Sequence, residues 1–195
     1  HSGSVINYKS LGTSYSGTTN YGYFFQNDIK TLDIFGEWYF NGTTLYVYFG
    51  NKSPDLFQVK VSTVNNLVLN NSGYDNIKIE NISLRGANQS TFYLSSADYF
   101  VIQNCDIDFS GENGIFIQWG SYVSCDNNLI NNSNRAGIYC AGGKNVILTN
   151  NTIRNSGIIP GAASTATQNN GIYVTQNDNG LIQYNDINYS GGNGI

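Results

Sequence analysis

Three charged residues in the middle of the chain are of the types that acid–base chemistry at a glycosidic bond requires. Asp108 and Glu112 are carboxylates four residues apart, and Arg135 follows Glu112 by 23 residues. Hydrolysis of such a bond uses two carboxyl groups, one as the general acid and the other as a base or nucleophile. For a catalytic site built here, we predict Asp108 and Glu112 as the carboxylates and Arg135 as the residue that orients the substrate. The alternative is that Glu112 and Arg135 form an ordinary surface ion pair.

Aromatic residues recur at a fixed interval and could contact a saccharide. Rings on one exposed face suit the C–H faces of a sugar polymer, but stacked rings also stabilise a repeat structure by cross-strand packing. Both interpretations stay open at this point. The predicted substrate contacts are four residues that each follow a recurrent apolar position, together with one at the next turn: Tyr93, Phe116, Tyr139, Tyr173 and Trp119.

The elements that must position these residues follow from an internal repeat. Leu84, Ile107, Ile130 and Ile153 are 23 residues apart, and Gly-Ile pairs recur at the same interval. One later interval is 34 residues, which indicates an insertion of 11 residues near 158–168. A pattern that survives an insertion is a structural repeat. The small residues and single Pro of the insertion predict a mobile flap beside the aromatic residues, with a neutral surface insertion as the alternative.

Each repeat contains three short segments in which inward apolar residues alternate with outward ones. This pattern predicts an all-β fold, a parallel β-helix with three short strands per coil and a period of about 23. Asn128, Asn151 and Asn185 share one inward position, where successive amides can hydrogen-bond to each other in a ladder. Asn also tolerates left-handed backbone, so we assign the tight turn of each coil to this position.

Two further carboxylate pairs also share recurrent positions. Asp75 and Asp98 lie in a turn, where Asp is an ordinary choice, so we expect a structural role for them. Glu80 and Asp126 are two coils apart with Gln103 between them, and this separation would suit an inverting hydrolase.

Composition excludes several classes of function. Only 11% of the residues are charged and the net charge is −4, so we predict no nucleic-acid partner. No apolar run is long enough to span a membrane. The only histidine is His1, and Cys105, Cys125 and Cys140 lack the spacing of metal ligands, so we predict no metal and no cofactor. We interpret the three cysteines as small buried hydrophobic residues.

A segment ahead of the repeat carries a recognisable motif. The stretch GEWY at 36–39, an Asn-Gly turn and LYVY at 45–48 predict a β-hairpin. This stretch resembles the GEWY…LYxYP segment that precedes the coils of many bacterial, carbohydrate-active right-handed β-helix proteins, which are largely glycoside hydrolase-like. The usual Pro-Pro after the second strand is absent here. The resemblance implies a right-handed coil, a location that is secreted, periplasmic or on the cell surface, and a polysaccharide or oligosaccharide partner bound along the aromatic strand face.

From these observations we predict an N-terminal segment over 1–65 and a solenoid over 66–195. Because no cap over the last coil is visible, we expect the coils to continue beyond Ile195. We also expect the protein to be a monomer or part of a longer chain. The leading prediction is a glycoside hydrolase acting on a polysaccharide. The alternatives are a polysaccharide lyase acting on a uronate polymer and a non-catalytic glycan-binding or surface solenoid.

Overall fold

The computed structural model describes residues 28–159 and 168–195, which fall into two compact units divided between Val59 and Lys60. The first unit contains the predicted hairpin, in which β1 (Trp38–Phe40) pairs antiparallel with β2 (Leu45–Val47). Two single-turn helices flank it, η1 (Ile29–Thr31) and η2 (Pro54–Leu56). No helix among the described residues has the length and apolar character that crossing a membrane requires.

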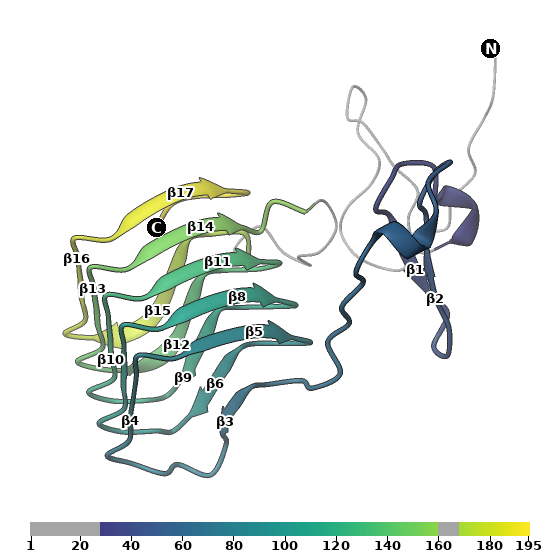
Figure 1. Ribbon diagram of the computed structural model, residues 1–195. Coiled ribbons are helices and arrows are strands. Elements are labelled where there is room, and N and C mark those ends of the chain that lie inside the picture. The colour runs from purple at the N-terminus through teal and green to yellow at the C-terminus, as the bar shows by residue number, and fades with distance from the viewer. Residues whose placement is uncertain (1–27, 160–167) are drawn as a thin grey trace, which may run out of the picture. The chain divides into compact units, whose positions relative to one another are not determined.

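The second unit is the predicted all-β solenoid, in which three parallel sheets of five strands each run along one axis (Figure 1). Sheet I contains β3 (Val68–Asn70), β6 (Phe92–Ser95), β9 (Ile115–Gln118), β12 (Ile138–Lys144) and β15 (Ile172–Asp178). Sheet II contains β4 (Lys78–Glu80), β7 (Val101–Gln103), β10 (Ser124–Asp126), β13 (Ile147–Thr149) and β16 (Leu181–Gln183). Sheet III contains β5 (Ser83–Ala87), β8 (Asp106–Ser110), β11 (Leu129–Ser133), β14 (Thr152–Ser156) and β17 (Asp186–Ser190).

The strand register follows the repeat read from the sequence. Ile130 pairs with Ile107 on one side and with Ile153 on the other, each 23 residues away. Ile153 pairs with Ile187 across the longer interval of 34 residues, so the insertion leaves the register intact. Residues 160–167 of the insertion, on which the predicted flap depends, lie outside the described residues.

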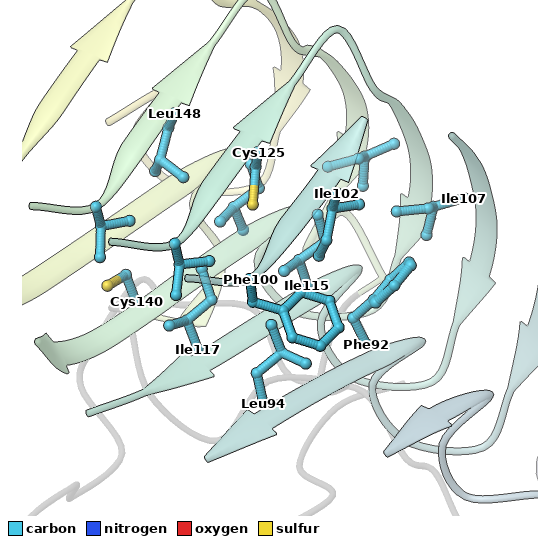
Figure 2. Close-up of a cluster of buried hydrophobic side chains, with 14 of the residues drawn as sticks. Phe92, Leu94, Phe100, Ile102, Ile107, Ile115, Ile117, Cys125, Cys140 and Leu148 are labelled. Carbon is cyan, nitrogen blue, oxygen red and sulfur yellow. The ribbon is translucent and has the colours of Figure 1, made fainter. Parts of the chain in front are cut away.

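The core is a column of apolar side chains that points inward from all three sheets (Figure 2). Alternation along each strand sends one residue in and the next out, and stacking of identical coils places like residues above one another. Most of these side chains are completely buried. The largest are Phe92, Phe100, Leu94, Ile102, Ile107, Ile115, Ile117, Ile130, Ile138, Leu148, Ile153 and Ile172.

The predicted asparagine ladder is present in the interior. The Nδ2 group of Asn128 donates to Oδ1 of Asn151 at 2.9 Å, and Nδ2 of Asn151 donates to Oδ1 of Asn185 at 2.9 Å. The left-handed backbone is one residue earlier than we predicted, at Asn127 and Asn150, whose φ angles are 51° and 53°. The ladder residue must aim its amide inward, so the residue before it takes the turn.

Left-handed backbone recurs at four corner positions of the coils, which accounts for much of the Gly and Asn content. Both residue types accept positive φ at low cost. Aromatic residues occupy some of these positions as well. The four positions hold Gly73, Ser96, Trp119, Gly142 and Gln176; Asn76, Tyr99, Tyr122, Asn145 and Asn179; Asn81, Asn104, Asn127, Asn150 and Tyr184; and Gly86, Phe109, Asn132, Asn155 and Tyr189.

The three cysteines are free and buried in the core, as the sequence indicates. Burial raises the pKa of the Cys140 thiol to about 11 and also raises the pKa of Cys125. Because the thiolate is the nucleophile, we expect no labelling by iodoacetamide at pH 8 while the protein is folded, and full labelling in denaturant, read by intact mass. Rapid modification of the native protein would show that the coils open more readily than this core implies.

Candidate functional site

The aromatic residues predicted from the sequence form a continuous column on the outer face of sheet I. Tyr93, Phe116, Tyr139 and Tyr173 align in register on four adjacent strands. Successive ring centroids are each 5.1 Å apart, with interplanar angles of 54°, 60° and 56°. We call these four residues the aromatic face.

The rings of the aromatic face pack on one another and are also partly open to solvent. Each ring meets the next in a tilted or edge-to-face arrangement, which is the favoured geometry of aromatic pairs. All four side chains are half-buried. The column therefore stabilises the solenoid by ring packing and leaves part of each ring exposed, while saccharide contact stays a prediction.

The outward residues of sheet I carry no charge through the middle of its strands. A second outward position, two residues after the aromatic one, holds Ser95, Gln118, Ala141 and Thr175 in register. The charged residues of the described sheet I strands are Lys144 and Asp178, which pair in register at the strand ends. The face is thus flat, aromatic and neutral.

Trp119 follows β9 directly and lies flat against the next coil. A Cβ atom built on Gly142 would overlap Cε3 and Cζ3 of Trp119, with Cδ2 next nearest, so the six-membered ring covers the glycine face-on. The indole nevertheless remains 54% exposed. One ring face therefore rests on backbone while the other is available to a ligand.

Glu112 and Arg135 lie together in the turns that lead into β9 and β12. The backbone N–H of Arg135 donates to the carbonyl of Glu112 at 2.9 Å, which stacks the two turns. Nη1 of Arg135 then contacts Oε1 of Glu112 at 3.1 Å, with the two side chains 27% and 32% exposed. The buried Nε of Arg135 has no hydrogen-bond partner among the described residues.

Asp108 lies in a different network, on sheet III. Its Oδ2 contacts Nη2 of Arg85 at 2.9 Å, and its Oδ1 accepts a hydrogen bond from Nδ2 of Asn132 at 2.9 Å. The side chain is only 10% exposed, because these two neighbours cover it. No contact found among the described residues joins Asp108 to Glu112 or Arg135, so the structure brings together two of the three predicted catalytic residues.

The other carboxylate pairs are also engaged in structural contacts. Asp126 accepts hydrogen bonds from Asn150, Thr149 and Gln103, and these bonds lower the pKa of Asp126. A carboxyl group held in its ionised form is poorly suited to be a general acid. Glu80, its predicted partner, contacts Lys78 at 2.6 Å.

Asp75 and Asp98 accept hydrogen bonds from backbone N–H groups of the next coil, at Asp98 and Ser121. This is the structural role that the turn position indicates. Within residues 28–159 and 168–195, no three His, Cys, Asp or Glu side chains are grouped so as to hold a metal ion.

A protein-family model, described as the right-handed β-helix region, matches residues 65–195, which is more than half of the chain. This chain belongs to the right-handed β-helix family. No curated protein and no solved structure gave a match to it. Family membership fixes the handedness of the coil that the strand pattern alone leaves open.

Sequence reasoning overlooked one exposed aromatic pair on this right-handed β-helix. Tyr99 and Tyr122 lie on successive coils with their rings stacked, at a centroid distance of 4.8 Å. They belong to a corner column that otherwise holds Asn76, Asn145 and Asn179. The signal was present in the sequence, because an aromatic pair interrupts a column of asparagines at the 23-residue interval.

Proposed function

We propose that this protein binds a neutral polysaccharide on the aromatic face of sheet I. The observation that carries the proposal is the uncharged column of half-open rings, and Trp119 lies beside this column, after β9, with a free indole face. Sugar rings present C–H groups that pack on aromatic faces, and a row of rings along the solenoid axis suits a polymer. The role also fits the broad association of β-helix proteins with carbohydrates and a location outside the cytoplasm.

The charge of this surface favours a neutral polymer over a uronate. A polyanionic chain would be attracted by cationic side chains along its path. The outward residues in the middle of the sheet I strands are aromatic, aliphatic or uncharged polar. The aromatic face consequently supports a lyase acting on a uronate polymer less well than it supports binding of a neutral glycan.

Glycoside hydrolysis is the second candidate function, because Glu112 and Arg135 lie at the start of two strands of sheet I. The Glu112 side chain is 32% exposed, and its ion pair with Nη1 of Arg135 holds the carboxylate beside the aromatic strands. Hydrolysis needs a second carboxyl group within about 5–10 Å of the first. The predicted second group, Asp108, is committed to Arg85 and Asn132, so the described geometry supports binding more strongly than catalysis.

Replacing Tyr139 tests the binding proposal. We expect the wild-type protein to be retarded in affinity electrophoresis by one or more of xylan, mannan, arabinan and mixed-linkage glucan. Tyr139→Ala should lower the affinity by about tenfold, which corresponds to roughly 1.4 kcal/mol for the loss of a central ring. The matched control is Tyr189→Ala, which removes an exposed tyrosine of sheet III. Equal retardation of both variants and the wild type would contradict the proposed binding face.

Product analysis separates the two candidate functions. The protein is incubated with the same polysaccharides and with polygalacturonate and alginate, and the products are analysed by mass spectrometry. Fragments that carry an added water, abolished in Glu112→Gln with binding intact, would establish hydrolysis. Fragments with an unsaturated end would establish a lyase. Binding without any products supports the binding function alone.

A further inference from the structure

Exposed aromatic side chains gather at the corner between sheets I and II. Trp119 and Tyr122 lie in the turn from β9 to β10, and Tyr99 lies in the equivalent turn of the preceding coil. They are 54%, 50% and 53% exposed. The Tyr99 and Tyr122 rings are parallel within 3°. We call these three residues the corner patch.

The backbone of the corner patch is in a conformation that bulky residues avoid. The φ angles of Tyr99, Trp119 and Tyr122 are 52°, 56° and 56°. Positive φ crowds Cβ against the neighbouring carbonyl group, so a bulky residue there is a true outlier. Most coils use small or polar residues at the same two positions, namely Gly73, Asn76, Ser96, Gly142, Asn145, Gln176 and Asn179.

Those other coils show that the fold does not require aromatic residues at this corner. A costly backbone conformation at exposed residues is most often retained where the side chains serve a function. Strain alone does not identify the function, because Tyr184 and Tyr189 are also left-handed at other corners. What distinguishes the corner patch is that its rings are grouped and continuous with β9, the strand that carries Phe116 of the aromatic face.

Two rings of the corner patch, those of Tyr122 and Trp119, reach towards the same coil. The centroids of Tyr99 and Tyr122 are 4.8 Å apart, which is the spacing of neighbouring strands, so their rings stack along the solenoid axis. The free face of Tyr122 therefore points towards the next coil, where its column holds the short side chain of Asn145. Trp119 reaches that same coil by lying on Gly142.

The three residues of the corner patch carry no charge, and the charged groups that border them are Asp98 and Lys144, the latter paired with Ser121. The Asp98 carboxylate, next to Tyr99, accepts a hydrogen bond from the backbone N–H of Ser121 at 2.7 Å. Ring faces and phenol hydroxyls are thus the groups that the patch presents. These are the groups that contact the C–H faces and hydroxyls of a neutral sugar.

We propose that the corner patch is a second contact site for the neutral polysaccharide, on which sugar rings stack where the polymer passes beyond the aromatic face. The inference rests on the proposed function and extends the binding surface from sheet I around the corner towards sheet II. It assigns Tyr99 and Tyr122 a binding role.

The test replaces each ring by the residue that another coil uses at the same position. Tyr122→Asn and Trp119→Ser should each lower the affinity for the polysaccharides that the wild type binds by about tenfold. The melting temperature of Tyr122→Asn should stay unchanged or rise by up to roughly 3 °C, because Asn tolerates positive φ and the lost ring stacking offsets only part of that gain. Tyr184→Asn is the matched control, because it makes the same substitution at a left-handed corner remote in sequence and should leave affinity unchanged.

Fluorescence gives an independent readout. The chain has two tryptophans, so Trp38→Phe leaves Trp119 as the sole reporter, and its emission should shift to the blue when the polysaccharide binds. One outcome would refute the binding role of the corner patch and leave that of the aromatic face intact. In that outcome Tyr139→Ala weakens binding, Tyr122→Asn and Trp119→Ser bind like wild type, and the Trp119 emission does not shift. If none of the four neutral polysaccharides binds the wild type, both proposals are overturned.

Discussion

Asn151→Ala is expected to lower the free energy of unfolding by about 3–5 kcal/mol, the largest loss we expect from a single side chain of the solenoid. Oδ1 of Asn151 accepts from the backbone N–H and Nδ2 of Asn128, at 3.1 and 2.9 Å. Its Nδ2 donates to the carbonyl of Cys125 and to Asn185, each at 2.9 Å. The side chain is completely buried, so water cannot replace it. The substitution leaves polar groups of both neighbouring coils without a hydrogen-bond partner.

Urea denaturation, followed by circular dichroism at fixed protein concentration, measures this loss as a shift of the midpoint. Asn188→Ala is the matched control, since it removes an exposed asparagine of β17 and should change stability by less than about 0.5 kcal/mol. Asn185→Ala, at the last described rung, should give an intermediate loss because this side chain is only partly buried. A loss below about 1 kcal/mol in Asn151→Ala would mean that the ladder does not couple the coils.

Periodicity alone predicted the fold because every coil repeats the same environment. The 23-residue interval, with one longer interval of 34, placed Leu84, Ile107, Ile130, Ile153 and Ile187 in one inward column, and the structure pairs them in that register. A strand slip by one residue would turn each of these side chains outward, so the hydrophobic pattern strongly specifies the register. The ladder of Asn128, Asn151 and Asn185 was predicted in the same way, because these three residues share one inward position of the repeat.

The candidate site was less predictable because it depends on contacts that cross columns. Asp108 lies on the outward side of its strand as predicted, and its column does place Arg85 directly before it. Its burial also needs Asn132, which belongs to a neighbouring column and reaches Asp108 from a left-handed position with φ of 52°. Glu112 and Arg135, in contrast, share one column and meet as the spacing indicates.

Gly142→Ala is expected to lower the free energy of unfolding by about 2–4 kcal/mol and to displace Trp119. The φ angle of Gly142 is +86°, which strains any residue with a Cβ, and the added methyl group would overlap the indole ring. We expect the change in urea denaturation and, in a Trp38→Phe background, as a red shift of Trp119 emission. A stability equal to wild type would show that the indole does not rest on this glycine.

A double-mutant cycle separates the two causes of this loss. In a Trp119→Ser background, Gly142→Ala should cost only the backbone strain, about 1–2 kcal/mol, because the overlapping ring is gone. Gly143→Ala supplies the contrast, since its added methyl group would overlap the backbone carbonyl of Gly120, which no change at Trp119 can remove. A coupling energy between Trp119 and Gly142, but none between Trp119 and Gly143, would show that position 142 must be glycine because the indole packs on it. Loss of polysaccharide affinity in Gly142→Ala would then follow from the position of the indole, although the substitution itself adds only a methyl group beneath the ring.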